Sequence, residues 1–413
     1  MNLLKTYYEF VLDNTESPIA FHRWSMITVV GALLARNISY RNGHSVYYPT
    51  MYTNLIGDAG TRKTSAMNIP VRLAKLAGYT SVAKGKTSKE KFLEDLSKGF
   101  NHVKGAKKET IELDELLNDM DITVHHECII AAEEFTNFIG VHNFEFAAML
   151  GELWDYVGPY EHRIRNGKSI IVDDPIISII SGNTPTGLAQ AFPPEMTGQG
   201  FMSRLLLIYS DKSGRSFPFP KDPDPLLEQE LVNHLFFIRN SVRGEVELEP
   251  EAKTYLAHVY QNYPAMDDYR FRAYHNRRFT HLLKLCMVIA AMEGRLKVTE
   301  RDALYCNTML AQAELFMPKA LSEFGNTRYA AVSGRVIQLL HDNLLTPLTI
   351  ADIYKQVRQE VDGMVELSQV LRNLADADVI QEKDGKFLPC ILGAEKVENF
   401  VDWNLLEEYN GIS

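Results

Sequence analysis

Apolar runs separated by short polar turns predict an α/β fold. The first helical patterns cover residues 3–12 and 18–35, and Ser17-Pro18 supplies a cap followed by the proline that a helix accepts in its first turn. Further along, short apolar runs of strand length alternate with helical patterns at 64–76 and 144–156. The expected buried strands are Met51–Ile56, Cys128–Ala132, Ile176–Ser181 and Leu205–Tyr209. Such alternation is typical of a parallel sheet flanked by helices.

Local signals refine the pattern before residue 121. Asn42-Gly43 lies between two strand-like runs and predicts a hairpin turn. Thr87 and Glu90 have the spacing of a capping box at the head of a helix. Residues 100–121 are polar, first lysine-rich and then acid-rich, so we expect them to form an excursion on the surface.

The last third of the chain changes character twice. After the proline-rich segment 217–225 the pattern is helical to about residue 320, and it includes a helix expected from Arg278 to Met292. Beyond Thr327 we expect three helices and then a strand pair that turns at Asp384-Gly385. These helices are expected over 330–341, after Thr349, and over 364–375. Three helices followed by a small hairpin predict a winged-helix domain.

The composition is that of a folded protein with more than one domain. The chain has 413 residues, 46% of them hydrophobic and 23% charged. Its four cysteines form no close pair, so neither a zinc site nor a disulfide framework is expected. The net charge of -10 excludes a uniformly basic surface but leaves room for a local basic stripe. The longest apolar run, Met26–Ala35, is too short to span a membrane, and we expect a cytoplasmic protein of a bacterium or phage-infected host without a membrane partner.

A glycine-rich loop directly follows the strand that ends at Ile56. Its residues are Gly57, Asp58, Ala59, Gly60, Thr61, Arg62, Lys63, Thr64 and Ser65. Glycines let backbone N–H groups surround phosphates at the positive end of the following helix, Lys63 can reach the β- and γ-phosphates, and Thr64 can complete a Mg²⁺ shell. Arg62 replaces the second glycine of the motif, and either weakens affinity or itself faces a phosphate. The loop predicts binding of ATP with Mg²⁺; the alternative is a strand–turn–helix with a chance triplet.

Polar residues follow two later strands. Glu133 and Glu134 end the apolar run from Cys128, and we assign Glu133 to the metal shell and Glu134 to the general base that orients the attacking water. Asn183 follows the next strand, where it can hold that water or sense the γ-phosphate. The alternative for Asn183 is an ordinary turn asparagine before Thr184-Pro185.

Basic residues supply two further candidate sites. Arg204 precedes the strand at Leu205 and lies where ring ATPases carry an arginine that reaches the neighbouring subunit's γ-phosphate. Arg163, Arg165 and Lys168 surround the tip of a hairpin that turns at Asn166-Gly167, which can follow a DNA backbone. An ordinary surface ion pair for Arg204 and a solvated hairpin without a ligand are the alternatives.

Taken in order, these motifs resemble the P-loop ATPases of phages and mobile elements of the helicase and primase-associated type, related to minichromosome-maintenance and superfamily 3 helicases. The resemblance covers residues 15–320 and is carried by Gly57–Ser65, Cys128–Glu134, Trp154-Asp155, Ser181-Gly182-Asn183 and Ser203-Arg204. It implies an AAA+/ASCE-like sheet that forms a ring, a hexamer, and moves on single-stranded DNA. It further implies a second sensor arginine that contacts the nucleotide, for which Arg277 and Arg278 compete; we assign Arg278.

The resemblance and the pattern together predict five parts. These are N-terminal helices and a hairpin packing on the core over 1–50, the ATPase core over 51–225, a helical lid over 226–326, the winged helix over 327–392 and a tail over 393–413. No primase domain and no long N-terminal DNA-binding region are recognisable, so other replication proteins are expected partners. In the winged helix, Gln369, Arg372 and Asn373 can contact DNA, but nearby acids favour protein contacts or a lid on the ring.

Three function classes follow from these expectations. The first is a DNA-dependent ATPase motor, a helicase of a phage or mobile element acting in replication. The second is a helicase loader or initiator-like switch that hydrolyses ATP slowly and does not translocate. The third is a P-loop kinase for a small molecule, which leaves Ser203-Arg204 and the winged helix without a task.

Overall fold

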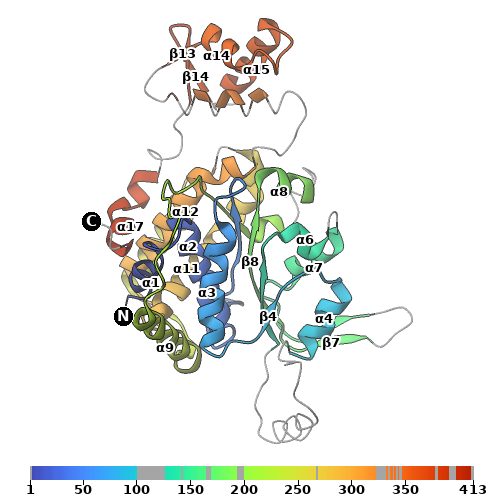
Figure 1. Ribbon diagram of the computed structural model, residues 1–413, viewed down its shortest axis with the longest axis vertical. Coiled ribbons are helices and arrows are strands. Elements are labelled where there is room, and N and C mark those ends of the chain that lie inside the picture. The colour runs from blue at the N-terminus through green and yellow to red at the C-terminus, as the bar shows by residue number, and fades with distance from the viewer. Residues whose placement is uncertain are drawn as a thin grey trace, which may run out of the picture.

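A five-stranded sheet, parallel throughout, lies at the centre of this computed structural model (Figure 1). The structure describes residues 2–99, 126–140, 143–163, 169–192, 200–266, 268–321, 347–376, 380–389 and 397–410, with short stretches between 332 and 343. The strands run in the order β4 (Val82–Ala83), β5 (Glu127–Ala132), β8 (Ile176–Asn183), β3 (Tyr52–Ile56) and β9 (Leu205–Tyr209). The predicted α/β class with a parallel sheet is therefore confirmed.

The register of the sheet brings the ends of four strands to one edge. Ile56 at the end of β3 pairs with Asn183 of β8 on one side and with Tyr209 of β9 on the other. Ala132 at the end of β5 pairs with Ser181. Ligands of open parallel sheets bind outside the carboxyl ends of the strands. We call this the carboxyl edge of the sheet.

Helices cover both faces of the sheet, which is why its strands read as continuous apolar runs. On one face, the hydroxyl of Thr28 in α2 (Ile19–Leu34) lies 2.7 Å from that of Thr53. The preceding residue of β3 points the opposite way, and the Tyr52 hydroxyl donates to the carbonyl of Leu150 in α7 (Phe144–Glu152) at 2.8 Å. The first face also holds α3 (Lys63–Leu76), which packs on α2. Helix α2 is buried along almost its whole length, so it belongs to the core of the fold.

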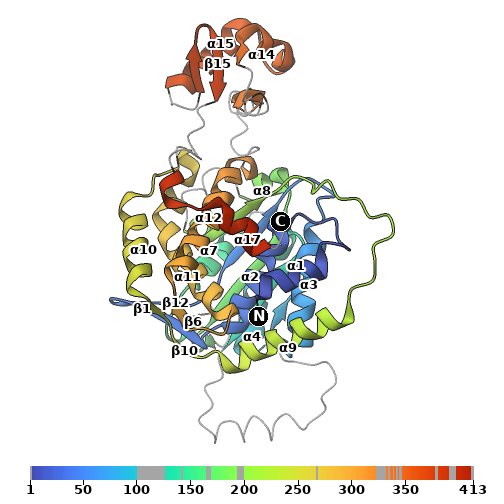
Figure 2. The ribbon, with the colours of Figure 1, turned by 90° about the vertical axis from the view of Figure 1, so that its left-hand side faces the viewer.

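The helical half of the chain and both ends of the described sequence share that core. Its helices are α9 (Pro225–Ser241), α10 (Pro250–Asn262), α11 (Arg272–Met292) and α12 (Glu300–Ala320). One cluster of buried apolar side chains runs from Leu3 in α1 (Leu3–Val11) to Leu321, and also includes Phe400 and two leucines of α17 (Trp403–Asn410). Helix α17 packs against α1 and α12, as Figure 2 shows. The predicted tail of the chain thus contributes its last helix to the main body.

A small unit near the C-terminus has its own hydrophobic cluster. It contains α14 (Ile350–Val357), α15 (Met364–Asp376) and an antiparallel sheet in the order β13 (Leu348–Thr349), β15 (Lys386–Pro389) and β14 (Ile380–Lys383). The Thr349 side chain caps α14 and Asp352 returns the bond, which confirms the predicted helix start. The predicted turn at Asp384-Gly385 is also confirmed, with φ of 53° and 73°.

Two predicted turn signals are displaced by one residue. Asn42 pairs with Ser45 between β1 (Ile38–Asn42) and β2 (Ser45–Tyr47), so Gly43-His44 forms the turn, and Gly43 supplies the positive φ of 61°. Helix α4 (Lys89–Ser97) is capped by Ser88, which accepts from the Lys91 N–H, and not by Thr87 with Glu90. The predicted hairpin is present with a shifted turn, and the cap moved to Ser88, whose hydroxyl has the same chemistry as that of Thr87. The excursion expected over 100–121 lies outside the described residues.

Two helix boundaries also differ from the prediction, because tertiary contacts override the local pattern. Helix α11 begins at Arg272 instead of Arg278, since Tyr274 is buried and donates a hydrogen bond to Glu314 at 2.8 Å. Helix α7 ends at Glu152 instead of residue 156, and Asp155 takes a positive φ of 64° as the chain turns away. Within the described part of the chain, none of the helices combines the length and the apolar character that a membrane crossing requires.

The turn after α7 is fixed by a buried ion pair. The Lys284 side chain of α11 is 0% exposed, and its ammonium donates to Asp155 at 2.5 Å and to the Tyr48 carbonyl at 2.8 Å. The same ammonium lies 4.5 Å from the centre of the Trp154 ring. This pair joins α11 to the start of the central sheet and to the end of α7.

Lys284→Met is expected to lower the free energy of unfolding by about 3 kcal/mol, because it leaves the Asp155 carboxylate buried without its partner. Lys319→Met is the matched control, since Lys319 is an exposed residue 3.6 Å from Asp211 and its loss should cost about 0.5 kcal/mol or less. Urea unfolding followed by near-ultraviolet circular dichroism measures both. Equal free energies of unfolding for the two variants would contradict the structural importance of the buried pair.

Candidate functional site

The glycine loop lies at the carboxyl edge, between β3 and α3. The Gly57 N–H donates to the Asn183 carbonyl at 3.3 Å, which ties the start of the loop to the end of β8. A Cβ atom on Gly57 would lie 2.7 Å from the Ser210 carbonyl oxygen, so this position has room only for glycine. Gly60 has a φ of 84°, a conformation that glycine adopts without strain. The loop therefore needs both glycines to pass close to β9 and to turn into α3.

Arg62 is the last loop residue before α3, and its backbone explains why the motif has glycine there. It has φ 60° and ψ 31°, the left-handed conformation. Its guanidinium turns back to Glu16, with Nη2 2.7 Å and Nε 2.8 Å from Oε2. The Arg62 carbonyl accepts from the Ser17 hydroxyl at 2.8 Å. Both predictions for Arg62, weaker affinity or a contact with a phosphate, stay predictions, and its guanidinium is paired with Glu16.

The Lys63 ammonium is held by the loop itself. Its Nζ donates to the carbonyl oxygens of Gly57 at 2.6 Å and Asp58 at 2.9 Å, and lies 3.2 Å from the Thr61 hydroxyl. Burial lowers the pKa of Lys63, and the carboxylates of Asp58 and Glu134 partly oppose that shift. The side chain of Arg62, the N-cap residue of α3, makes no capping hydrogen bond, so the N–H groups around Thr64 and Ser65 have no side-chain acceptor from the N-cap. A cation and the positive end of a helix thus lie together.

The two glutamates after β5 are exposed and act on different neighbours. Glu134 lies within electrostatic range of Lys63, and its Oε2 accepts from the Asn137 side chain at 2.6 Å. Glu133 acts instead on Lys84, whose pKa is lowered by burial and raised in part by this carboxylate. The structure therefore brings Glu134 to the lysine of the loop, whereas the metal role assigned to Glu133 gains no contact that supports it.

Asn183 is the last residue of β8 and is buried. Its Oδ1 accepts from the side chain of Asn54 at 3.1 Å, and Asn54 lies in β3 two residues before the strand ends. The turn that follows is capped separately, because Thr184 accepts from the Gly187 N–H at 3.0 Å. Asn183 is thus a strand residue beside the loop, and not the ordinary turn asparagine of the alternative. The sequence signal for Asn54 was a polar residue within a predicted buried strand, and our sequence reading missed it.

Arg204 lies at the opposite end of the sheet from its own glycine loop. It ends the 3-10 helix η2 (Met202–Arg204), and the next residue, Leu205, pairs with Tyr52 at the start of β3. The five residues of β9 separate it from the carboxyl edge, a distance of about 16 Å. Its Nη1 donates to the Gly200 carbonyl at 2.6 Å, and its guanidinium lies 5.5 Å from the Trp154 ring centre. Within the described residues its buried Nε–H has no acceptor.

The two competing arginines of α11 have different surroundings. Arg277 lies beside Arg204: its Nε donates to the Ser203 hydroxyl at 2.8 Å and its guanidinium lies 5.9 Å from the Trp154 ring centre. Burial and this neighbour lower the pKa of Arg204. Arg278 is only 3% exposed and forms an ion pair with Glu314 at 2.7 Å. The assignment of Arg278 to the nucleotide is therefore corrected, because its guanidinium is occupied inside the helical body.

The predicted basic hairpin is described in part. Its strands β6 (Tyr160–His162) and β7 (Ile170–Val172) pair antiparallel, as expected. The Arg163 side chain is 82% exposed and lies 3.0 Å from Glu161. Arg165 and Lys168 lie outside the described residues.

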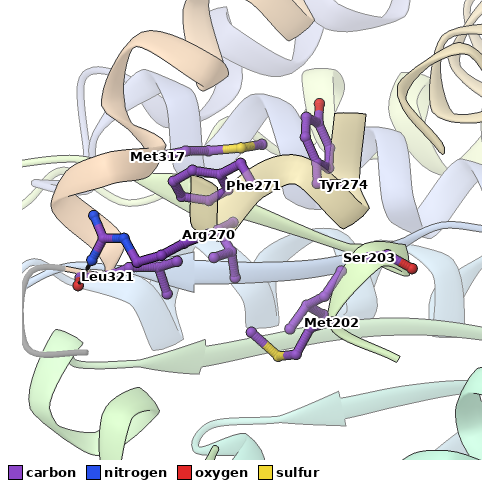
Figure 3. A pocket seen from close by; sticks show the side chains of 9 residues that line it. Met202, Ser203, Arg270, Phe271, Tyr274, Met317 and Leu321 are labelled. Atoms are coloured by element: carbon purple, nitrogen blue, oxygen red, sulfur yellow. Dashed lines mark hydrogen bonds between the residues drawn. The ribbon is translucent and has the colours of Figure 1, made fainter. Parts of the chain in front are cut away.

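A pocket opens beside Arg204 and away from the glycine loop. Figure 3 shows side chains of η2, the start of α11 and the end of α12 around it. Its lining residues are Met202, Ser203, Leu205, Leu207, Arg270, Phe271, Tyr274, Met317 and Leu321. The lining is mostly apolar, and the guanidinium of Arg270 is paired with Asp268. In the part of the chain that the structure covers, no group of three or more His, Cys, Asp or Glu side chains is placed to hold a metal ion.

The carboxyl edge therefore collects a loop with a half-buried lysine, the start of a helix, a carboxylate and a buried asparagine. Comparison with protein-family models and with curated protein sequences finds no match to this chain.

Proposed function

We propose that the chain is an ATPase whose nucleotide site is the glycine loop at the carboxyl edge. The observation that carries the proposal is the meeting of Lys63, Glu134 and Asn183 from three separate segments at one edge of a parallel sheet. Phosphates bind where backbone N–H groups, a helix start and a lysine converge. We also propose that the glycine loop is a P-loop.

The residues present fit a nucleoside triphosphate with Mg²⁺. Gly57 lets the loop pass close to β9, Gly60 supplies the positive φ of the turn into α3, and Arg62 makes no capping hydrogen bond that would compete with a phosphate at the start of α3. Magnesium in such sites is held mainly by phosphates and water with one or two protein oxygens, for which Thr64 and a glutamate suffice. Bound Mg-ATP supplies the reactive phosphoryl group and the charge that the metal neutralises.

The chain's own residues then have separate tasks. Lys63 exchanges its loop carbonyls for phosphate oxygens and offsets their charge. Glu134 accepts the proton of the attacking water, and Asn137 orients that carboxylate. Asn183, which is held by Asn54 at the end of β8, positions the water. We also propose that Glu133 contacts Mg²⁺, although none of its interactions with the described residues supports this role.

Arg204 supports a site shared between copies of the chain. A side chain about one strand length from its own loop cannot reach a phosphate bound there. It can serve a neighbouring copy, which favours a ring and a hexamer, and Arg277 is available beside it.

The polymer on which such a ring acts is proposed to be single-stranded DNA. The support is the hairpin of β6 and β7, with Arg163 exposed next to its tip. The winged-helix assignment of the unit around α14 and α15 also belongs to this proposal. A ring-forming DNA-dependent motor, a helicase acting in replication of a phage or mobile element, accounts for all of these features.

Hydrolysis of ATP by the wild-type chain is expected to rise about tenfold or more when single-stranded DNA is added, because backbone binding orders the ring in its active arrangement. Arg163→Ala with Lys168→Ala should remove most of that stimulation while basal hydrolysis persists. Lys91→Ala with Lys98→Ala removes the same charge from two exposed positions, in α4 and at its C-cap, and is the control. Wild-type hydrolysis that ignores DNA would favour the loader or initiator-like switch.

A further inference from the structure

Three segments that are distant in the sequence meet at Glu16. They are residues 15–17 before α2, the end of the glycine loop, and residues 213–217 after β9. The Glu16 carboxylate uses its two oxygens separately: Oε2 accepts from Arg62 at 2.7 Å, and Oε1 accepts from the Phe217 N–H at 2.9 Å. The Glu16 carbonyl accepts from the Ser213 hydroxyl at 2.5 Å.

Further bonds hold the same segments together. The Arg215 guanidinium donates to the carbonyls of Thr15, at 3.2 Å, and Ser17. The Ser17 hydroxyl donates to the Arg62 carbonyl at 2.8 Å. Both the side chain and the backbone of Arg62 are therefore fixed by the segment 15–17, which is itself fixed from the other side by the segment 213–217.

Arg62 has a backbone conformation that glycine would adopt freely and an arginine adopts at a cost. Without a partner, the arginine would favour the ordinary right-handed region and would move Lys63, the next residue. The ion pair to Glu16 compensates for this preference. The contact with Glu16 thus stabilises the loop conformation that a glycine at position 62 would adopt without a partner.

We infer that Glu16 is a positioning residue for the nucleotide site: through Arg62 it holds the glycine loop in its binding conformation before the ligand arrives. The inference rests on the proposed function and goes beyond it, because it gives the arginine in the motif and the segment before α2 a role in ATP binding. A loop that is already shaped binds more tightly, since ligand binding does not have to order it.

The test measures the dissociation constant of ADP by isothermal titration calorimetry on the full chain. Glu16→Gln is the informative change, because the single acceptor oxygen of glutamine cannot serve Arg62 and Phe217 at once. ADP is expected to bind about fivefold more weakly, the size of effect that loss of one pre-formed contact produces. In an Arg62→Gly background, where glycine needs no partner, the same Glu16→Gln change should alter the constant by less than about 1.5-fold.

The control is an ion pair of similar exposure on the same helix. Arg72 of α3 pairs with Glu228, with side chains 47% and 28% exposed, against 55% for Arg62 and 22% for Glu16. Glu228→Gln should leave ADP binding unchanged. Thermal unfolding of each variant without nucleotide provides the second readout.

Three results would overturn the inference. The first is an unchanged dissociation constant of ADP in Glu16→Gln. The second is a loss of ADP affinity of similar size in the wild-type and Arg62→Gly backgrounds. The third is a lower melting temperature of Glu16→Gln without weaker ADP binding. Failure of the proposed function looks different. In that case Lys63→Ala binds ADP as the wild type does, whatever Glu16→Gln shows.

Discussion

Replacing Lys63 with alanine should reduce ATP hydrolysis at least about a thousandfold, because the charge that develops on the phosphoryl oxygens loses its nearest cation. The lysine is already in place: its ammonium lies 2.6 Å from the Gly57 carbonyl and 2.9 Å from the Asp58 carbonyl. These contacts keep a partly buried cation inside the loop, and a triphosphate would replace carbonyl partners with charged ones.

Steady-state phosphate release by the purified protein measures this effect. Lys75→Ala removes an exposed lysine near the end of the same helix and is the matched control, with an expected rate within about twofold of the wild type. The measurement also needs a fold check by circular dichroism. Hydrolysis that survives in Lys63→Ala and falls in Lys75→Ala would show that the glycine loop is not the site.

The second large effect is expected for Arg204→Ala, which should lower the turnover number on the order of a thousandfold, the usual size of an arginine-finger deletion. Affinity for nucleotide should change much less, since the nucleotide-binding residues of each copy remain intact. Because Arg204 is separated from its own loop by the length of β9, its effect is expected to act between copies.

Mixing the two inactive variants tests this arrangement directly. An assembly that contains both Lys63→Ala and Arg204→Ala copies has some interfaces with an intact lysine on one side and an intact arginine on the other. Hydrolysis should therefore return in part, and should depend on the ratio of the two proteins. If every mixture is as inactive as the two variants alone, whatever their ratio, Arg204 has a structural task within its own chain, such as its contacts with Gly200 and Trp154.

The sheet could be predicted well from the sequence because parallel strands are buried on both faces and leave a clear apolar run. The strand at 205–209 was predicted with its observed bounds, and the neighbouring polar ends of β5 and β8 could be located from their position after such runs. The strand order could not be inferred from these runs, since nothing in a single apolar segment specifies its neighbours.

Contacts between distant segments account for most of what the sequence reading missed. Glu16 and Arg62 are separated by 46 positions, and no local pattern links them. Arg278 was assigned to the nucleotide because it was expected at a helix start, whereas α11 begins earlier and turns this arginine toward Glu314. In both cases the residue type was informative about chemistry, but its partner was decided by the packing of helices.

The return of the chain end to the main body limits what the small unit around α14 and α15 can do. Phe400 accepts hydrogen bonds from Tyr255 and Asn307 through its carbonyl, at 2.6 and 2.7 Å, so the chain after residue 397 is fastened to α10 and α12. The small unit is therefore an insertion with two attachment points. An internal deletion that joins the two attachment points would remove the unit and keep the cover over α1 and α12, whereas a truncation at residue 390 would remove that cover and keep the unit.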